Sequence, residues 1–401
     1  MKIIVQKFGG TSLDTQEKRE IAARHIKSAV ERGNYPVVVV SAMGRKGDPY
    51  ATDTLINMVY RVSEDIDPRE KDMLMSCGEV ISAVVMVQTL SSFGLKARAL
   101  TGAQAGIVTD NNFGDSSVIK VNPEKIMELI NSNIIPVIAG FQGVNMDGEI
   151  TTLGRGGSDT TASVIGAAIN ASFIEIFTDV EGVMTADPSM VDKAKILDKV
   201  SYNEVCELAY QGARVLHPRA AEIAMREGIP IRVRSIFNEN PGTIIQNGYK
   251  GIKGDRPVTA VTSRRNIIFV RVIPRKVAEY ANGLAVFKVL SKNGISVDFI
   301  NIRPEAISFI IVDELEDKVK KILSDNNFNF EIADDFAKVS VVGGGMTGRP
   351  GVMARIVEAL SRENISIYQT TDSHTTISCL VKKQEEKKAL NALHSAFKLE
   401  E

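Results

Sequence analysis

The sequence has few of the features that mark secreted, metal-binding or nucleic-acid-binding proteins. Only 3 of its 401 residues are cysteine; Cys77, Cys206 and Cys379 lie far apart, and no CxxC pair occurs. The four histidines show no metal-ligand spacing. Lys and Arg number 48 against 49 Asp and Glu, so no surplus of positive charge is present to hold a nucleic acid backbone. We therefore predict reduced thiols, a cytoplasmic location, no metal-ligating cluster and small-molecule partners rather than nucleic acid.

Long apolar runs and a leader are also missing. No run approaches the length of a membrane span, and MKIIVQKFGG predicts a first strand, not a signal peptide. We expect no membrane partner. The remaining composition, with 44% hydrophobic and 24% charged residues, is typical of a globular protein, and the length suggests two or three domains.

Residues 1–235 alternate short apolar runs with helical patterns, which predicts an α/β catalytic domain. Expected strands are 2–8, 36–43, 96–102, 134–141, 173–180 and 230–236. Several are apolar without alternation, as in parallel strands that are buried on both faces. Helices are expected at about 16–32, at 201–228 as far as Pro218, and where Leu55, Met58, Val59 and Val62 share one helical face. The predicted fold is an open, mostly parallel sheet sandwiched by helices.

The chain after residue 235 contains an internal repeat. Residues 236–265 are rich in Gly, Asn and Pro and are predicted to be a linker with at most one short strand. LSKNGIS at 290–296 then recurs as LSRENIS at 360–366, and the register holds without a gap. Each copy predicts strand, helix, strand, strand, helix, a small α+β module of the ferredoxin-like, split-βαβ type. We place module 1 at 266–335 and module 2 at 336–401, as binding or association devices.

Two glycine clusters are candidate phosphate and anion sites. In KFGGTS, Gly9 and Gly10 let backbone N–H groups approach an anion, and Lys7 offers positive charge to a transferring phosphoryl group. In TTLGRGGSDTTA, Arg155 suits a carboxylate or phosphate, and Asp159 falls in the first turn of a helix. Either cluster alone is equally compatible with a plain turn.

Two further stretches place polar groups where ligands bind or where burial is costly. Thr178 and Asp179 end a strand, and ligands of open α/β sheets lie at the carboxyl ends of strands. A simple turn explains the pair as well. Glu79 interrupts the apolar helix LMSCGEVISAVVMV, so its carboxylate needs a partner. A structural ion pair or the ammonium group of a ligand would serve.

Seven motifs follow one another along the chain: KFGGTS, SAMG with TDTL, SCGE, GFQG, TTLGRGGSDTTA, FTDVEGVMTADP and GARVLHP. In this order they resemble the motif series of the aspartokinases, members of the amino-acid kinase family. The two repeated modules resemble the ACT domains at the C-terminus of that family. The resemblance covers essentially the whole chain and points to a monofunctional enzyme, since the GxGxxG match at 343–348 is followed by too little chain for a dinucleotide-binding domain.

The resemblance implies transfer of the γ-phosphoryl group of ATP to the side-chain carboxylate of L-aspartate, giving 4-phospho-L-aspartate, with Mg²⁺ on the phosphates. It assigns catalytic roles to Lys7 and Asp159. The aspartate-binding residues it implies are Ser41, Thr52, Glu79, Phe141, Arg155, Gly156, Gly157 and Ser158. The nucleotide-binding residues it implies are Lys7, Phe8, Gly9, Gly10, Thr178, Asp179, Met184, Thr185, Asp187, Ser189 and Arg214. A carboxylate acceptor is ionised at neutral pH, so positioning and charge compensation suffice for catalysis.

The chain departs from the family pattern at several positions. At three positions where Tyr, Arg and Lys are common in the family, this chain has Met184, Ser189 and Arg214. These changes affect the expected contacts with the nucleotide. Module 1 lacks the glycine turn that module 2 has in GMTGRPG. We expect an amino-acid effector near Asp298 and Asn301, although both also suit a polar surface after a strand. DSHTTI at 372–377 resembles the diaminopimelate-sensitive type, with lysine and threonine as further candidates.

The resemblance places the enzyme at the first step of the lysine/diaminopimelate, threonine and methionine pathway, under feedback control. The alternatives are another acid kinase of the same fold and a non-catalytic amino-acid sensor on a kinase scaffold. Sheet edges of such modules usually pair with another module, so we also predict a homodimer or higher homo-oligomer joined through residues 266–401.

Overall fold

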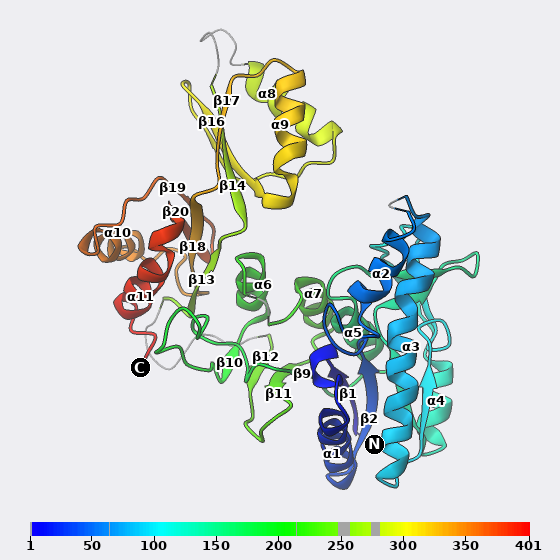
Figure 1. Ribbon diagram of the computed structural model, residues 1–401. Helices are drawn as coiled ribbons and strands as arrows, with labels where there is room; N and C mark the ends of the chain where they lie inside the picture. Colours follow the sequence, from blue (N-terminus) through cyan, green and yellow to red (C-terminus); the bar gives the residue numbers. More distant parts are fainter. Residues whose placement is uncertain (1, 64, 214, 248–256, 274–280) are drawn as a thin grey trace. The chain divides into compact units, whose positions relative to one another are not determined.

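A computed structural model describes residues 2–63, 65–213, 215–247, 257–273 and 281–401 of the chain (Figure 1). The chain divides into two compact units. Unit 1 comprises Met1–Val183, Ile196–Ala209 and Arg214–Lys250, and unit 2 comprises Met184–Lys195, Tyr210–Ala213 and Gly251–Glu401. The chain therefore passes from unit 1 to unit 2 at residue 184 and returns to unit 1 at residue 196, within the part of the sequence that resembles a kinase.

The centre of unit 1 is an eight-stranded sheet with the order β10-β12-β11-β9-β1-β2-β6-β3. Its strands are β1 (Lys2–Phe8), β2 (Asn34–Val40), β3 (Ala97–Leu100), β6 (Ile135–Ala139), β9 (Ile174–Thr178), β10 (Lys199–Val200), β11 (Ile231–Ser235) and β12 (Thr243–Ile245). All six strands expected from the sequence form, and they are neighbours that pair in parallel. β12 pairs antiparallel with β11 and β10 pairs parallel with β12, so these two edge strands run opposite to the other six. The predicted mostly parallel sheet is confirmed.

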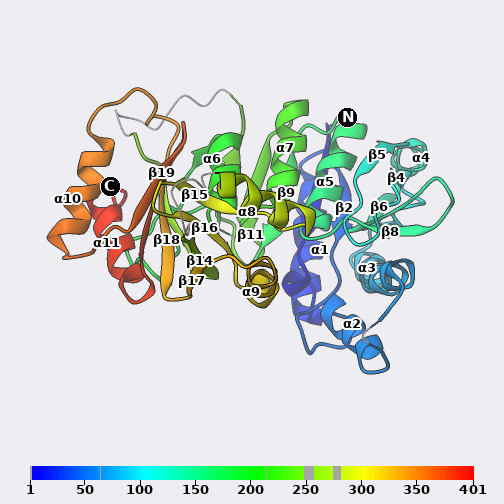
Figure 2. The ribbon, with the colours of Figure 1, turned by 90° about the horizontal axis from the view of Figure 1, so that it is seen from above.

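Helices cover both faces of this sheet, as Figure 2 shows. On one face lie α1 (Gln16–Glu31) and α3 (Pro68–Ser92); on the other lie α5 (Gly157–Ala168) and α7 (Pro218–Glu227). The side chains of a strand alternate between faces. Phe8 therefore packs into the core beneath α1 and α3, whereas its neighbour Lys7 points toward α5. This alternation decides which side of the sheet carries the chemistry.

Unit 1 also contains a second, four-stranded sheet and further short helices. The sheet has the order β5-β4-β7-β8. Its strands are β4 (Ile107–Thr109), β5 (Val118–Val121), β7 (Gln142–Val144) and β8 (Ile150–Thr152), and the helices are α2 (Thr52–Tyr60) and α4 (Glu124–Asn131). The expected helix around Leu55 thus forms as α2 but ends before Val62, and Met58 on its apolar face is exposed.

One expected helix is two helices. α6 (Tyr202–Tyr210) ends eight residues before Pro218, and Pro218 is the first residue of α7. A proline lacks the N–H that an interior helical position requires, but the first turn leaves that N–H unpaired in any case. Pro218 therefore begins a helix where we had expected it to end one.

α3 is the one helix of the described segments that is long and apolar enough to cross a membrane by length and composition. The sequence pattern had suggested that no segment reaches this length. In unit 1, however, Met86 and Leu90 of α3 join the core beneath the sheet. The helix also buries two carboxyl groups, of Asp72 and Glu79. Charged groups are costly in a bilayer, so these features are typical of a core helix.

Unit 2 contains the two repeated modules. Module 1 consists of β14 (Ile267–Val272), α8 (Ala281–Lys292), β15 (Asp298–Ile302), β16 (Ile307–Val312), α9 (Glu316–Asp325) and β17 (Phe330–Ala333). Module 2 consists of β18 (Phe336–Val342), α10 (Val352–Arg362), β19 (Gln369–Asp372), β20 (Thr376–Lys382) and α11 (Glu386–Ala396). The predicted order of strand, helix, strand, strand, helix is present in both. The contrast between the GMTGRPG turn and its counterpart at 275–281 falls mostly outside the described residues.

The expected linker at 236–265 contains two short strands where we had expected at most one. β12 extends the sheet of unit 1, and β13 (Ala260–Arg264) pairs antiparallel with β18. In module 1 the corresponding edge position beside β14 belongs to β17, which follows α9. Module 2 takes this strand from the chain that precedes module 1. Neighbouring Gly, Asn and Pro residues hid both short strands from a composition-based reading.

Candidate active site

A cavity of about 550 Å³ lies in unit 1 at the carboxyl end of β1 and the N-terminus of α5. Residues from β1, α2, α3, the start of α5 and the loops after β2, β4, β6 and β8 line it. The lining residues are Lys7, Ser41, Thr52, Ile56, Lys71, Met75, Glu79, Gly114, Phe141, Gly154, Arg155, Gly156, Gly157, Ser158 and Asp159. Every residue that the sequence assigned to catalysis or to aspartate binding is in this set. Their roles remain predictions, but the fold brings these ten side chains and glycines together.

An ion pair joins the two residues expected to be catalytic. Lys7 Nζ lies 2.6 Å from Asp159 Oδ1, and the two side chains are only 12% and 15% exposed. Lys7 reaches α5 because it is the second-last residue of β1 and lies on the α5 face, and Asp159 is in the first turn of α5. An anion at a helix N-terminus is favoured by the helix dipole. The pair therefore fixes an ammonium group at the edge of the cavity.

The two glycines that follow β1 differ in what their missing side chains permit. A Cβ on Gly10 would lie 2.3 Å from the carbonyl oxygen of Ala42, so the close approach of two backbones requires glycine there. A Cβ on Gly9 would meet nothing closer than 3.8 Å, and Lys7 Nζ is one of the two atoms at that distance. The Gly9 N–H donates to the carbonyl of Phe177 at 3.3 Å. Packing explains Gly10, whereas Gly9 borders Lys7.

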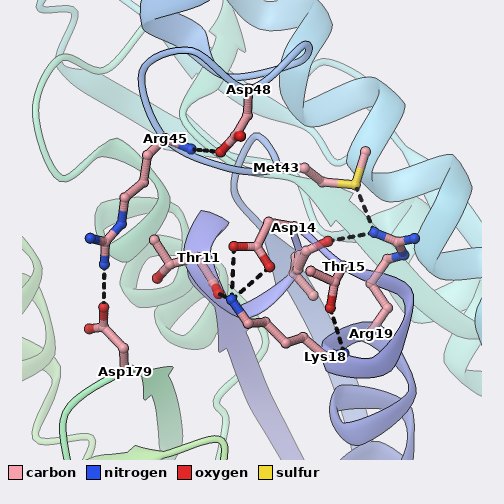
Figure 3. Close-up of polar contacts among 10 residues, drawn as sticks. Thr11, Asp14, Thr15, Lys18, Arg19, Met43, Arg45, Asp48 and Asp179 are labelled. Atoms are coloured by element: carbon pink, nitrogen blue, oxygen red, sulfur yellow. Dashed lines mark hydrogen bonds and ion pairs between the residues drawn. The ribbon is translucent and has the colours of Figure 1, made fainter.

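α1 does not follow directly on the glycine turn, so its N-terminus is not adjacent to Gly9 and Gly10. Gly10–Ser12 form a single 3-10 turn, and α1 begins at Gln16 with Thr15 as its capping residue. Lys18 Nζ donates to the Thr11 carbonyl at 2.9 Å and to Asp14 at 2.8 Å, which holds the intervening loop (Figure 3). The helix N-terminus that does line the cavity is that of α5.

Close packing accounts for the glycines at the start of α5. Gly156 has φ 68°, and a Cβ there would lie 2.2 Å from His217 Cγ. A Cβ on Gly157 would lie 2.6 Å from the Phe141 ring. Phe141 itself has φ 69°, a strained conformation for an aromatic residue, and its N–H donates to Thr161 Oγ1 at 3.0 Å. Such strain in a cavity wall is typical of functional sites.

Glu79 is a buried carboxyl group with one unsatisfied oxygen. Only 3% of the residue is exposed, and Oε1 accepts a hydrogen bond from the Ala42 N–H at 3.1 Å. Oε2 is buried and makes no hydrogen bond to the described residues. Burial raises the pKa of Glu79 to about 8, while the Ala42 N–H opposes that shift. A buried carboxylate without a counter-ion is suited to receive a cationic group from a ligand.

Sequence reasoning missed five of the lining residues: Ile56, Lys71, Met75, Gly114 and Gly154. Helical spacing was the available signal. Lys71, Met75 and Glu79 are four residues apart on α3 and therefore share one face. Thr52 and Ile56 have the same relation on α2. Lys71 adds a second ammonium group to the wall, and its Nζ donates to the hydroxyl of Tyr60 at 2.9 Å.

The expected nucleotide-binding residues are divided between the two units. Phe8 is buried and stacks on Phe177 with ring centroids 4.7 Å apart. Thr178 ends β9 in unit 1 and Asp179 follows it, and Asp179 accepts from Arg45 Nη2 at 2.7 Å (Figure 3). Asp179 is therefore already paired, with a cation from the loop after β2.

Unit 2 contains four of the expected nucleotide-binding residues: Met184, Thr185, Asp187 and Ser189. The contacts that they make there stabilise the fold. Thr185 Oγ1 lies 2.9 Å from Nε2 of the buried His394 on α11. Asp187 Oδ1 accepts from the N–H and the hydroxyl of Ser189 at 2.8 and 2.6 Å, which stabilises the turn. Arg214 lies outside the described residues. A nucleotide role for these residues remains a prediction.

The two expected effector residues are in β15 of module 1. Asp298 Oδ2 lies 2.5 Å from Nζ of Lys338 on β18, and Lys338 is 2% exposed. Asp298 is therefore the counter-ion of a buried lysine, not a free surface carboxylate. Asn301 is half-buried in the same strand, beyond an irregularity in its pairing with β16. A pair that links the two modules is compatible with an effector site, and it does not identify an effector.

Comparison with known proteins agrees with this geometry. The sequence model of the "Amino acid kinase family" matches residues 2–235, and an "ACT domain" model matches 331–395. Aspartokinase 1 of Bacillus subtilis is 47% identical over 403 residues, and the alignment spans all of both chains. The chain belongs to the aspartokinases of the amino acid kinase family. An aspartokinase of Geobacillus stearothermophilus is 38% identical over 415 residues, which cover 100% of this chain and 98% of the relative.

Solved structures of aspartokinases have the same fold. Escherichia coli aspartokinase III, crystallised with aspartate and ADP, superposes with a TM-score of 0.80 at 24% identity, over 98% of this chain and 99% of that one. Clostridium acetobutylicum aspartate kinase gives 0.77 at 26% identity, over 99% and 100% of the two chains. The predicted family, the fold class and the presence of an ACT domain at the C-terminus are therefore confirmed.

Proposed function

We propose that the chain is an ATP-dependent aspartate kinase that forms 4-phospho-L-aspartate in the cytoplasm at the first step of amino-acid biosynthesis from aspartate. Full-length identity to aspartokinases supports the activity. One structural observation supports the proposed residue roles: Lys7, Asp159, Arg155 and Glu79 line one cavity. These groups match a phosphoryl group, an α-carboxylate and an α-ammonium group. The described cysteines are free thiols, in keeping with a reducing compartment.

The residues divide the work between binding and charge compensation. Arg155 takes the α-carboxylate of aspartate, and Glu79 receives its ammonium group at the unpaired Oε2. Ser41, Thr52, Phe141 and Ser158 complete the walls. Lys7, oriented by Asp159, compensates charge that develops on the transferring phosphoryl group. The acceptor carboxylate is ionised at neutral pH and needs no general base.

Mg²⁺ is expected with the nucleotide. The described residues contain no cluster of three or more His, Cys, Asp or Glu that would hold a metal by themselves. Mg²⁺ bound mainly by phosphate oxygens and water needs only one or two protein carboxylates, and Asp159 lies at the cavity wall. The residues therefore fit a metal that arrives with ATP and that offsets phosphate charge when bound.

A coupled assay of ADP release with a panel of carboxylic acids tests the activity, with hydroxylamine trapping of the acyl phosphate. We expect turnover with L-aspartate and a trapped hydroxamate. Preference for another acid would favour a different acid kinase of this fold. If no acid is turned over but amino acids still bind, the chain is a sensor.

Arg155→Ala is expected to raise the KM for aspartate by roughly 10- to 100-fold, because a charge-assisted hydrogen bond to a carboxylate is worth about 1.5–3 kcal/mol. The KM for ATP should change little. Arg98→Ala, an exposed arginine on β3, is the control. Steady-state kinetics at varied aspartate and ATP give both constants; a rise confined to ATP would assign Arg155 to the nucleotide.

The ACT modules supply feedback regulation, with diaminopimelate as the first candidate effector, then lysine and threonine. An effector must bind one conformation better than another to change activity. Escherichia coli aspartokinase III has been crystallised with lysine and aspartate in its T-state, a precedent for that class of ligand. Titration of each amino acid against kinase rate identifies the effector.

Asp298→Ala is expected to destabilise unit 2 by about 1–3 kcal/mol, because it leaves the buried Lys338 without a counter-ion. The solvent exposure of Asp298 keeps the value below the roughly 3–5 kcal/mol that breaking a fully buried pair costs. Asp298→Ala combined with Lys338→Met should recover most of the loss, as measured by urea unfolding. Asn301→Ala is the better probe of effector binding, since it removes no buried charge. Equal stability of wild type and Asp298→Ala would contradict this account.

We also propose a homo-oligomer joined through residues 266–401. β15 is an edge strand of its sheet, and Ile300 and Ile302 on it are 49% and 57% exposed. Apolar edge strands are readily covered by a second strand. Light scattering should show a dimer or larger species at micromolar concentration, and Ile302→Lys should shift it toward monomer. A monomeric wild-type chain would refute the proposal.

A further inference from the structure

A second cavity lies in unit 1 on the α1 face of the central sheet, with a volume of about 190 Å³. Its walls come from β1, β9 and β11 and from the last turns of α1, and the starts of β1, β2 and β11 border it. The active-site cavity lies at the opposite, carboxyl ends of the strands. The two cavities share no lining residue.

This second cavity is strongly cationic. Lys2, Arg32, Arg232 and Arg234 line it, against a single carboxylate, that of Glu175. Strand alternation explains the position of two of these cations: in the β11 sequence IRVRS, the partly buried Arg232 and the buried Arg234 point to the same face. Side chains on the buried face of a central strand are ordinarily apolar. Burial of a guanidinium group is costly unless its donors are paired.

Glu175 leaves much of this positive charge uncompensated. Its Oε2 accepts from Gln6 Nε2 at 2.9 Å, and its Oε1 lies 3.5 Å from Arg232 and 3.9 Å from Arg234. These last two distances are too long for strong charged hydrogen bonds. Glu239 approaches Arg234 at 3.5 Å, but its own side chain is 79% exposed.

Three buried polar atoms here have no partner among the described residues: Nε of Arg232, Nε of Arg234 and Oε1 of Gln6. The Arg234 side chain is only 6% exposed. The first two atoms are donors and the third is an acceptor. The hydrogen bond to Glu175 fixes the orientation of the Gln6 amide, since the reverse would place two acceptors together. A ligand that satisfies all three atoms is an anion that also carries a hydroxyl group.

We propose that this cavity is a binding site for inorganic phosphate. At neutral pH hydrogen phosphate offers oxyanion acceptors for Arg232 and Arg234 and one O–H that can donate to Gln6 Oε1. Its charge of −1 to −2 offsets part of the excess of cations, and its size suits a cavity of about 190 Å³. Sulfate has the same shape but no proton to donate, so the site favours phosphate over sulfate.

Equilibrium dialysis with radiolabelled phosphate tests the site in the full chain. Saturating MgADP and aspartate are included to fill the active-site cavity, and ionic strength is held constant with NaCl. We expect saturable binding of one phosphate per chain at millimolar concentration or below, and at least tenfold weaker competition by sulfate. Arg232→Gln, on a side chain that is 34% exposed and safer to replace, should weaken binding at least tenfold.

Arg98→Gln is the matched control, because it removes an exposed arginine of the same sheet from outside the cavity, and its affinity should equal that of wild type. Arg234→Gln gives a second test, read only if its circular dichroism and melting temperature show a folded chain. Binding that survives Arg232→Gln, binding abolished by MgADP and aspartate, equal competition by sulfate, or no saturable binding would each overturn the proposal.

Discussion

Lys7→Ala is expected to lower kcat by about 10²- to 10³-fold with aspartate and ATP. This is the range seen when one preorganised group that stabilises transition-state charge is removed. Lys7 Nζ is held 2.6 Å from Asp159 Oδ1 at the wall of the cavity, so its position is fixed before substrate arrives. The KM for aspartate should change less than kcat, because the lost interaction is made mainly in the transition state.

Stability and a surface control separate this effect from misfolding. The melting temperature of Lys7→Ala should fall only modestly, since Asp159 loses its counter-ion but keeps a favourable place at the helix N-terminus. Lys27→Ala removes an exposed lysine of α1 and should keep full turnover. Near-normal kcat in a folded Lys7→Ala variant would remove Lys7 from the reacting centre.

Local signals were sufficient to predict the sheet, whereas the predicted cavity residues came partly from local signals and partly from the family resemblance. Six apolar runs marked the six parallel strands, and polar or glycine residues at strand and helix ends marked Lys7, Arg155 and Asp159. The carboxyl ends of neighbouring parallel strands meet at one edge of the sheet, which brings these residues together. Lys71 was missed although it shares a helical face with Glu79.

Features that depend on distant pairing could not be predicted in this way. β13 belongs to the sheet of module 2, yet 71 residues separate its last residue, Arg264, from the start of β18 at Phe336. The ion pair between Asp298 and the buried Lys338 likewise joins two modules. Nor does any local pattern show that Thr185 bonds to His394, 209 positions away. Each of these requires the three-dimensional contact to be known.

Glu79 gives the second large prediction, because one carboxyl group affects both stability and substrate affinity. Its pKa is raised by burial to about 8, whereas the same group in an unfolded chain titrates near 4.5. Between these values the unfolded state releases its proton and the folded state keeps it. The free energy of unfolding of the unliganded protein should therefore fall as pH rises from 4.5 to 8, and then level off.

Glu79→Gln removes this dependence and should raise the melting temperature of unliganded protein at pH 8 to 9, since an amide has no ionised form to bury. The Ala42 N–H can still donate to the amide oxygen. Glu31→Gln, an exposed position on α1, is the control and should leave the pH profile of stability unchanged. Thermal unfolding across pH 5–9 measures both. Parallel profiles for wild type and Glu79→Gln would contradict the burial argument.

Aspartate affinity should show the opposite trend. The ammonium group of aspartate requires the ionised carboxylate, so the KM of wild type should fall as pH rises toward 8 and the group loses its proton. Glu79→Gln should raise the KM for aspartate roughly 10- to 100-fold at pH 8, the value of a lost charge-assisted hydrogen bond, and flatten its pH dependence. Steady-state kinetics at saturating ATP from pH 6.5 to 9 test this. A variant with normal KM would mean that the buried oxygen Oε2 does not face the substrate. Glu79 would then be a structural residue that affects stability but not aspartate binding.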